Sequence, residues 1–136
     1  MNSFKFKKND LFIENISIKK LLNKFSTPFY CYSTNKLIEN DKNFEKYFKN
    51  LDPIICYAVK ANPNIALLKI LSKCGCGAEV VSEGELKRSI KANINPKKII
   101  FSGVGKTYKE LEFAINKNIL QINVESFEEI NLIEKI

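Results

Sequence analysis

Hydrophobic and polar residues alternate along most of the chain in blocks that predict strands and helices in turn. Runs rich in β-branched and other apolar residues are typical of buried strands, and apolar residues at helical spacing follow each run. The strand-like runs are 54–59, 78–81, 98–101 and 119–124, and the helical stretches begin near residues 64, 82, 107 and 126. This order predicts an α/β fold with parallel strands and right-handed helical crossovers. Because the strands are strongly apolar, we expect both faces of the sheet to be covered.

The first third of the chain has a looser pattern. Residues 4–18 alternate weakly, which predicts one or two short strands, and Ser17 is placed to cap a short helix that ends at Thr27-Pro28. Residues 28–33 predict one more strand, and a helix is expected from about residue 35 to residue 49. Leu37, Asp41, Phe44, Phe48 and Leu51 fall at helical spacing, so this helix is expected to be amphipathic, with this face inward and its lysines outside.

Several helix ends carry local signals. Gly75 and Gly77 are placed to end one helix and open the next strand. Ser82 is followed three residues later by Glu85, which is the spacing of a capping box, and Thr107 is expected to cap the following helix.

Lys60 is the main candidate for a functional residue. The apolar run 54–59 ends abruptly on it, and Pro63 forces a turn just beyond. Lys60 is therefore predicted at the carboxyl end of a strand, the edge at which parallel α/β folds build their sites. A partly desolvated amine there is a nucleophile toward a carbonyl group. The alternative is a lysine that ends a hydrophobic strand and keeps it soluble.

Other polar residues are predicted at the same edge of the sheet. Glu79 belongs to the second strand and could position a cation or a protonated ring group, or it could pair with a surface lysine. The remaining candidates at the strand ends are Ser82, residues 102–105, Glu125 and Ser126.

The loop at 103–107 (GVGKT) resembles the end of a phosphate-binding P-loop. That motif requires a further glycine, and Ile100 stands at its position, so the loop fails as a nucleotide-binding signature. A glycine-rich turn is the better interpretation, although exposed amides at a helix start could still meet an anion.

Composition narrows the classes of partner. The net charge is +7, but Arg88 is the only arginine and the lysines are scattered, so a nucleic-acid-binding function is not expected. The chain has no histidine, and Cys74 and Cys76 are too closely spaced for a usual zinc site, so no metal site is expected. Residues 1–9 lack the apolar region of a signal peptide and no run approaches membrane-spanning length, so neither a secreted nor a membrane-spanning protein is expected. The 136 residues predict a soluble cytoplasmic protein with one modest core.

Motifs along the whole chain resemble those of one enzyme family. Residues 57–62 (YAVKAN) are similar to the lysine motif of the fold type III, alanine-racemase-like pyridoxal-phosphate decarboxylases. Further stretches resemble the diaminopimelate decarboxylase branch, in order and spacing: 27–32 (TPFYCY), 77–86 (GAEVVSEGEL), 101–107 (FSGVGKT) and 122–126 (INVES). Together these motifs are far more specific than any one of them.

The resemblance implies a fold and a set of site residues. The fold would be the first half of a (β/α)8 TIM barrel, formed by residues 34–136, with residues 1–33 contributing to a second, β-rich domain. Lys60 would form a Schiff base with pyridoxal 5'-phosphate (PLP), and substrate amine would displace it during catalysis. Ala58 would line the cofactor pocket, and Glu79 stands where relatives carry an acidic residue near the Schiff base.

The function implied is decarboxylation of meso-2,6-diaminopimelate to L-lysine and CO2, by a protein that forms a homodimer. A related decarboxylase acting on ornithine, arginine or carboxynorspermidine, or a non-catalytic PLP-binding homologue, is the alternative. Other residues that the family uses belong to later barrel units and to the second domain. Residues 1–136 alone are therefore expected to be inactive and, with unpaired strand edges, poorly soluble.

Overall fold

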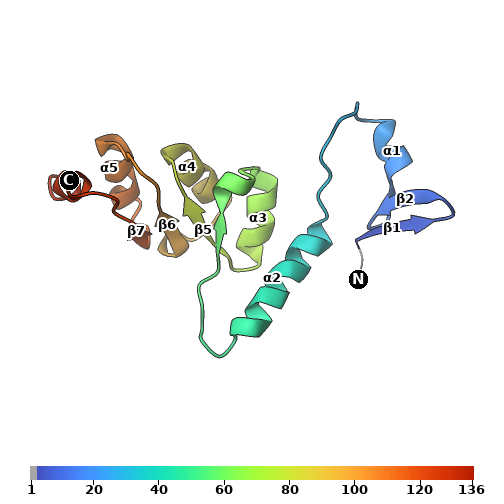
Figure 1. Cartoon of the computed structure of the whole chain (residues 1–136), viewed down its shortest axis with the longest axis horizontal. Helices are drawn as coiled ribbons and strands as arrows, with labels where there is room; N and C mark the ends of the chain where they lie inside the picture. The colour runs from blue at the N-terminus through green and yellow to red at the C-terminus, as the bar shows by residue number, and fades with distance from the viewer. Residues whose placement is uncertain (1–2) are drawn as a thin grey trace.

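A computed structural model describes residues 3–136. Figure 1 shows a small antiparallel sheet at one end of the molecule and a parallel sheet with its helices at the other, with helix α2 between them. The antiparallel sheet confirms short strands in the head of the chain, although it has three strands where one or two were predicted. Its elements and the short helix that follows are β1 (Phe4–Lys7), β2 (Asp10–Ile13), β3 (Ile16–Ser17) and α1 (Ile18–Leu22). Ser17 caps α1 as predicted, because its hydroxyl accepts a hydrogen bond from the Lys19 N–H.

The parallel sheet confirms the predicted α/β alternation. Its strands lie side by side in chain order, and all the pairs formed between β4 and β7 are parallel. The strands are β4 (Cys56–Ala58), β5 (Gly77–Val80), β6 (Ile99–Phe101) and β7 (Gln121–Ile122). The helices that follow them are α3 (Ile65–Lys73), α4 (Glu83–Lys91), α5 (Tyr108–Asn116) and α6 (Phe127–Ile133). Short 3₁₀ turns, η1 (Val59–Ala61) and η2 (Pro96–Lys98), complete the connections.

The core lies between the parallel sheet and its helices. It contains strand residues Ala78, Val80, Ile99 and Phe101, all fully buried, together with the helix residues Leu68, Leu86 and Ala114. The predicted burial of both faces is wrong for this part of the chain. Ala58, Glu79, Ile100 and Gln121 emerge from the opposite face through the strand register, and all four retain solvent exposure. Strands that follow one another in chain order, each joined by a right-handed crossover, place all their helices on one face.

Two predictions in the first third of the chain are also wrong. Residues 28–33 form no strand, because no other segment of residues 3–136 pairs with them. Helix α2 (Thr34–Phe48) does form, but the face expected to be buried is largely open: Phe44 is 53% exposed, and Leu51 lies beyond the helix end. A groove of about 510 Å³ separates this face from β4. Only Asp41 of α2 is buried among the described residues.

Gly77 opens β5 at a point where the backbone of η2 comes very close. A Cβ atom added to Gly77 would lie 2.1 Å from the Lys98 carbonyl oxygen and 2.9 Å from Cys56 Sγ. We expect Gly77→Ala to lower the free energy of unfolding by about 3 kcal/mol, because a backbone atom cannot move aside as a flexible side chain can. Urea unfolding measures the change.

Gly84→Ala is the matched control. Gly84 lies in α4, and an added Cβ would meet only the Ser82 hydroxyl, at 3.8 Å. This substitution should raise the free energy of unfolding by about 0.5 kcal/mol, since alanine favours helix. Equal stability of the two variants would contradict the close approach at Gly77.

Candidate functional site

Lys60 lies just past the carboxyl end of β4, in the middle of η1. The strand is shorter than predicted, since it ends at Ala58 and the chain then turns through one 3₁₀ turn. The Lys60 side chain is exposed, and its amine has no hydrogen-bond or ion-pair partner within residues 3–136. The residue thus lies at the predicted edge of the sheet and presents an unengaged amine there.

The turn that carries Lys60 is held by its neighbours. The Asn62 N–H donates to the Val59 carbonyl at 3.1 Å, and the Tyr57 hydroxyl donates to the Asn62 carbonyl at 3.5 Å. The Asn62 side-chain oxygen accepts from the Asn64 N–H at 3.0 Å, and Asn64 in turn caps α3. Pro63 fits between them because its missing N–H is not needed at a helix start. These bonds fix the backbone on both sides of Lys60.

Ala58 and Glu79 lie directly opposite each other on β4 and β5. Register partners on neighbouring strands place their side chains on the same face of a sheet, so both belong to the face that the helices leave open. Each side chain is partly exposed. The structure therefore brings Ala58 and Glu79 together and places Lys60 two residues beyond Ala58. The small methyl group of Ala58 leaves room over this part of the sheet.

The serines and the threonine at the strand ends serve mainly as helix caps. Ser82, Thr107 and Ser126 each accept a hydrogen bond from the backbone N–H three residues later. The residue at that third place is a glutamate in every case: Glu85, Glu110 and Glu129. Thr107 and Glu110 form a full capping box. The predicted box at Ser82 differs, because Glu85 accepts from the Val81 N–H instead of the Ser82 N–H.

Two of these glutamates, Glu110 and Glu129, also bond to the preceding strand-helix unit. Glu110 accepts from the Glu83 N–H of the preceding helix at 3.3 Å. Glu129 Oε1 accepts from Lys106 Nζ at 2.6 Å, while its Oε2 accepts from the Glu125 N–H at 3.1 Å. Sequence reasoning identified the caps but missed this second role. The only trace of these contacts in the sequence is the repeated Ser/Thr-x-x-Glu spacing at residues 82, 107 and 126.

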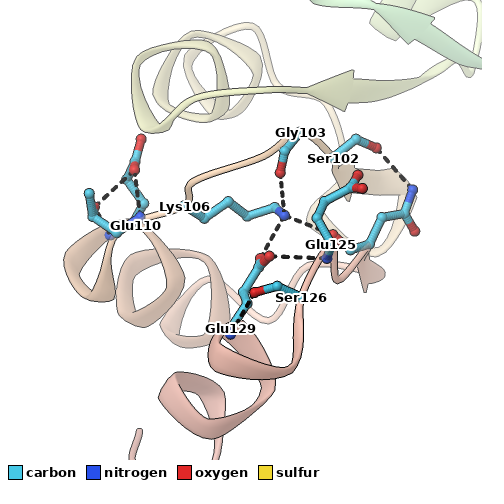
Figure 2. A network of polar contacts seen from close by, with 9 residues as sticks. Ser102, Gly103, Lys106, Glu110, Glu125, Ser126 and Glu129 are labelled. Carbon is cyan, nitrogen blue, oxygen red and sulfur yellow. Dashed lines mark hydrogen bonds and ion pairs between the residues drawn. The ribbon is translucent and has the colours of Figure 1, made fainter.

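Lys106 is the centre of the most buried polar network (Figure 2). Its side chain and that of Glu129 are only 2% and 6% exposed, and its amine also donates to the carbonyls of Gly103 and Asn123, at 2.6 and 2.7 Å. The Asn123 side chain donates to Ser102 Oγ at 2.9 Å. This amine points into the protein, so the loop cannot act as a P-loop, whose lysine must reach phosphate. The glycine-rich turn is confirmed by φ angles of 99° at Gly103 and 72° at Gly105.

Cys76 lies buried beneath α2, where its thiol donates a hydrogen bond to Asp41 Oδ1 at 2.9 Å. Burial, together with this bond to a carboxylate, raises the pKa of the Cys76 thiol from 9.0 to about 12. The thiolate is disfavoured, so Cys76 is unsuited to nucleophilic or metal-binding roles. Within residues 3–136 there is no group of three or more histidine, cysteine, aspartate or glutamate side chains placed to hold a metal ion.

The raised pKa predicts a pH-dependent stability. A thiol that keeps its proton in the folded state stabilises the fold fully below pH 9, and this contribution is lost as the pH rises toward 12. Wild-type protein should therefore lose stability relative to Cys76→Ala between about pH 9 and about pH 12, as urea unfolding at several pH values would measure. A difference between the two proteins that stays constant over this range would contradict the prediction.

The comparisons with known proteins agree on one family. The family model described as "Pyridoxal-dependent decarboxylase, pyridoxal binding domain" matches residues 34–136. The diaminopimelate decarboxylase of Aquifex aeolicus is 46% identical over 96% of this chain and 31% of its own length. The structure of M. jannaschii diaminopimelate decarboxylase with L-lysine is 36% identical, with a TM-score of 0.95 over 98% of this chain and 32% of its own. The arginine decarboxylase of Paramecium bursaria Chlorella virus is 28% identical, with a TM-score of 0.71 over 87% of this chain and 32% of its own.

This chain therefore spans about a third of the length of the relatives it matches. Among the described residues, no helix combines the length and the apolar character needed to cross a membrane. The family match covers α2, the whole parallel sheet and the residues Ala58, Lys60 and Glu79. The chain belongs to the pyridoxal-dependent decarboxylases, and its residues 34–136 match the pyridoxal-binding domain of that family.

Proposed function

We propose that this chain contributes the cofactor-binding part of a PLP-dependent decarboxylase that converts meso-2,6-diaminopimelate to L-lysine and CO2. The observation that carries the proposal is the 46% identity to a diaminopimelate decarboxylase across 96% of the chain. The structures of such decarboxylases also share its fold, at a TM-score of 0.95 for the M. jannaschii enzyme.

The residues present fit this cofactor. An aldehyde needs an accessible amine, and Lys60 offers one that is exposed and without a partner among residues 3–136. The neighbouring carboxylate of Glu79 suits a positively charged ring or Schiff-base nitrogen, and Ala58 opposite it leaves space. When bound, PLP supplies a ring that takes up the electron pair left as CO2 departs.

Each residue then has a defined task in the reaction. Lys60 Nζ would hold the cofactor in the resting protein, yield its place to the substrate amine, and take the cofactor back after product release. The Glu79 carboxylate would hold positive charge on the same face of the sheet. The backbone bonds at Val59, Asn62 and Asn64 would keep Lys60 at the strand end throughout, which limits the reorganisation that each exchange requires.

The finer architecture is part of the proposal. We propose that residues 34–136 form the first half of a (β/α)8 barrel and that residues 1–33 belong to a β-rich domain. The sequential order of β4 to β7 supports the first statement, because neighbouring strands of a (β/α)8 barrel are also consecutive in the chain. The separate antiparallel sheet and the start of the family match at residue 34 support the second.

A cytoplasmic homodimer is proposed as well. All four cysteines are free, which suits a reducing compartment. Large apolar side chains remain exposed on this chain, including Phe6, Tyr30 and Phe127, and such surface is commonly covered by further protein.

Measurement of CO2 release by the full-length protein, with PLP added, tests which amino acid is the substrate. meso-Diaminopimelate should be the preferred substrate over ornithine, arginine and carboxynorspermidine. The lower identity to the viral arginine decarboxylase, 28% against 46%, favours the diaminopimelate branch. Preference for another of these amino acids would establish the alternative decarboxylase, and no release from any of them would favour a non-catalytic homologue.

Residues 1–136 expressed alone should release no measurable CO2 from meso-diaminopimelate. In the described chain β4 and β7 are the edges of an open sheet, and the face that carries Ala58 and Glu79 is open to water. Water at the reacting atoms weakens every electrostatic interaction that decarboxylation needs. Release of CO2 by this segment with added PLP would contradict the expectation, and the full-length protein serves as the positive control.

A further inference from the structure

One buried ammonium group joins the loops that follow β6 and β7. A lysine amine has three N–H donors, and in Lys106 all three are used: on Gly103 O, Asn123 O and Glu129 Oε1. The first carbonyl belongs to the β6–α5 loop and the second to the β7–α6 loop. Figure 2 shows the amine between the Gly103 carbonyl and the carboxylate of Glu129, which projects from α6. Each acceptor lies within 2.7 Å of Nζ, so the two loops are held at a fixed separation.

The β6–α5 loop contacts the end of β5, the strand that carries Glu79. The Ser102 N–H donates to the Val80 carbonyl at 2.9 Å. Gly103 lies against Val81, whose Cβ is 3.5 Å from the place of a Gly103 Cβ. Val81 stands two residues after Glu79. A shift of the loop that Lys106 holds would therefore press on the end of β5, next to Glu79.

Stability alone is a weak explanation for this arrangement. A buried ion pair is often replaced by apolar residues without loss of stability, because desolvation of both charges offsets their attraction. The amine is not available to a ligand either, since Lys106 is 6% exposed and its donors are occupied. What an apolar pair could not reproduce is the simultaneous bond to two loop carbonyls.

We propose that Lys106 is a positioning residue for the cofactor site: its amine sets the separation of the loops after β6 and β7, and through Gly103 and Val81 it sets the place of Glu79 relative to Lys60. The proposal rests on the function proposed above. Glu129 completes the arrangement by orienting the amine and by accepting from the Glu125 N–H in the second loop.

The test compares PLP binding with thermal stability in the full-length protein. The variants are Lys106→Met and the double variant Lys106→Met/Glu129→Leu, with PLP affinity measured by equilibrium dialysis and melting temperature measured without cofactor. The single variant should lose both stability and affinity. The double variant should regain part of the lost melting temperature, because no charge is left buried alone, but it should still bind PLP about tenfold more weakly, because the loop carbonyls remain without their donor. A double variant that binds PLP as tightly as wild type would overturn the proposal.

Glu129→Gln provides the same comparison with a smaller change. Lys106 Nζ and the Glu125 N–H donate to different oxygens of Glu129, and glutamine puts an NH2 donor in place of one of these oxygens, so the side chain in its present position keeps only one of the two bonds. Weaker PLP binding by this folded variant supports the proposal, and unchanged binding overturns it. Wild type and Lys60→Ala are measured alongside. If wild-type protein does not bind PLP through Lys60, both the function and the positioning role fail; if it does, only the positioning role is at stake.

Discussion

Replacing Lys60 with alanine is expected to abolish covalent attachment of PLP and to lower decarboxylation by a factor on the order of a thousand or more. Lys60 presents an unengaged amine at the edge of the parallel sheet, and the turn around it is fixed by hydrogen bonds of Tyr57, Asn62 and Asn64. Borohydride reduction of the PLP-treated full-length protein, followed by peptide mass spectrometry, would locate the label. We expect it on Lys60 in wild type and on no residue in Lys60→Ala.

Two controls separate the chemistry of Lys60 from its charge and from lysine content in general. Lys60→Arg keeps a positive charge but carries a guanidinium group that stays protonated, so it should behave like Lys60→Ala. Lys69→Ala removes an exposed lysine from α3, in the same structural unit, and should leave labelling and activity unchanged. Label on another lysine in wild-type protein, with Lys60 unmodified, would refute the assignment.

The position of Lys60 could be predicted because its causes are local. An apolar strand, a proline three residues after the lysine and an asparagine cap for the next helix lie within ten residues of sequence. The same is true of the other parallel strands and their helices: the predicted caps Ser82 and Thr107 are confirmed, and the last helix begins after Ser126 as expected. Parallel pairing then follows from alternation, since two parallel strands need a crossover between them. One detail of the prediction was wrong: the strand ends at Ala58, so Lys60 lies within a 3₁₀ turn that follows the strand.

Features that depend on distant segments were not predictable in this way. The apolar spacing of α2 is clear in the sequence, but burial of Phe44 requires something to fill the groove beside β4, and residues 3–136 do not fill it. Residues 28–33 have the composition of a strand, but no segment of residues 3–136 pairs with them. A pattern specifies which residues can be buried, while the burial itself depends on what packs against them.

The hydrogen bonds around Lys106 could not be predicted either, because they join segments that are distant in sequence. Its members are separated by up to 27 positions in sequence, from Ser102 to Glu129, and the sequence of the loop indicated only a glycine-rich turn. The bonds appear only when β6 and β7 lie side by side, which brings Asn123 beside Ser102. Repetition of Ser/Thr-x-x-Glu at three helix starts was visible, but not the contact from Glu129 to the preceding unit.

The buried pair of Lys106 and Glu129 should dominate the response of stability to mutation in this region. Glu129→Leu is expected to lower the free energy of unfolding by about 3–5 kcal/mol, because it leaves the Lys106 ammonium buried without its carboxylate. It also leaves the Glu125 N–H without its acceptor. Urea unfolding followed by circular dichroism would measure the loss.

Glu128→Leu is the matched control, since Glu128 is the preceding residue on α6 and is exposed. It should change the free energy of unfolding by less than about 0.5 kcal/mol. Addition of Lys106→Met to Glu129→Leu removes the stranded charge, so the double variant should be more stable than Glu129→Leu alone, even though two substitutions have been made. Additive losses from Lys106→Met and Glu129→Leu would mean that the two side chains do not interact in the folded protein, which would contradict the 2.6 Å contact between them.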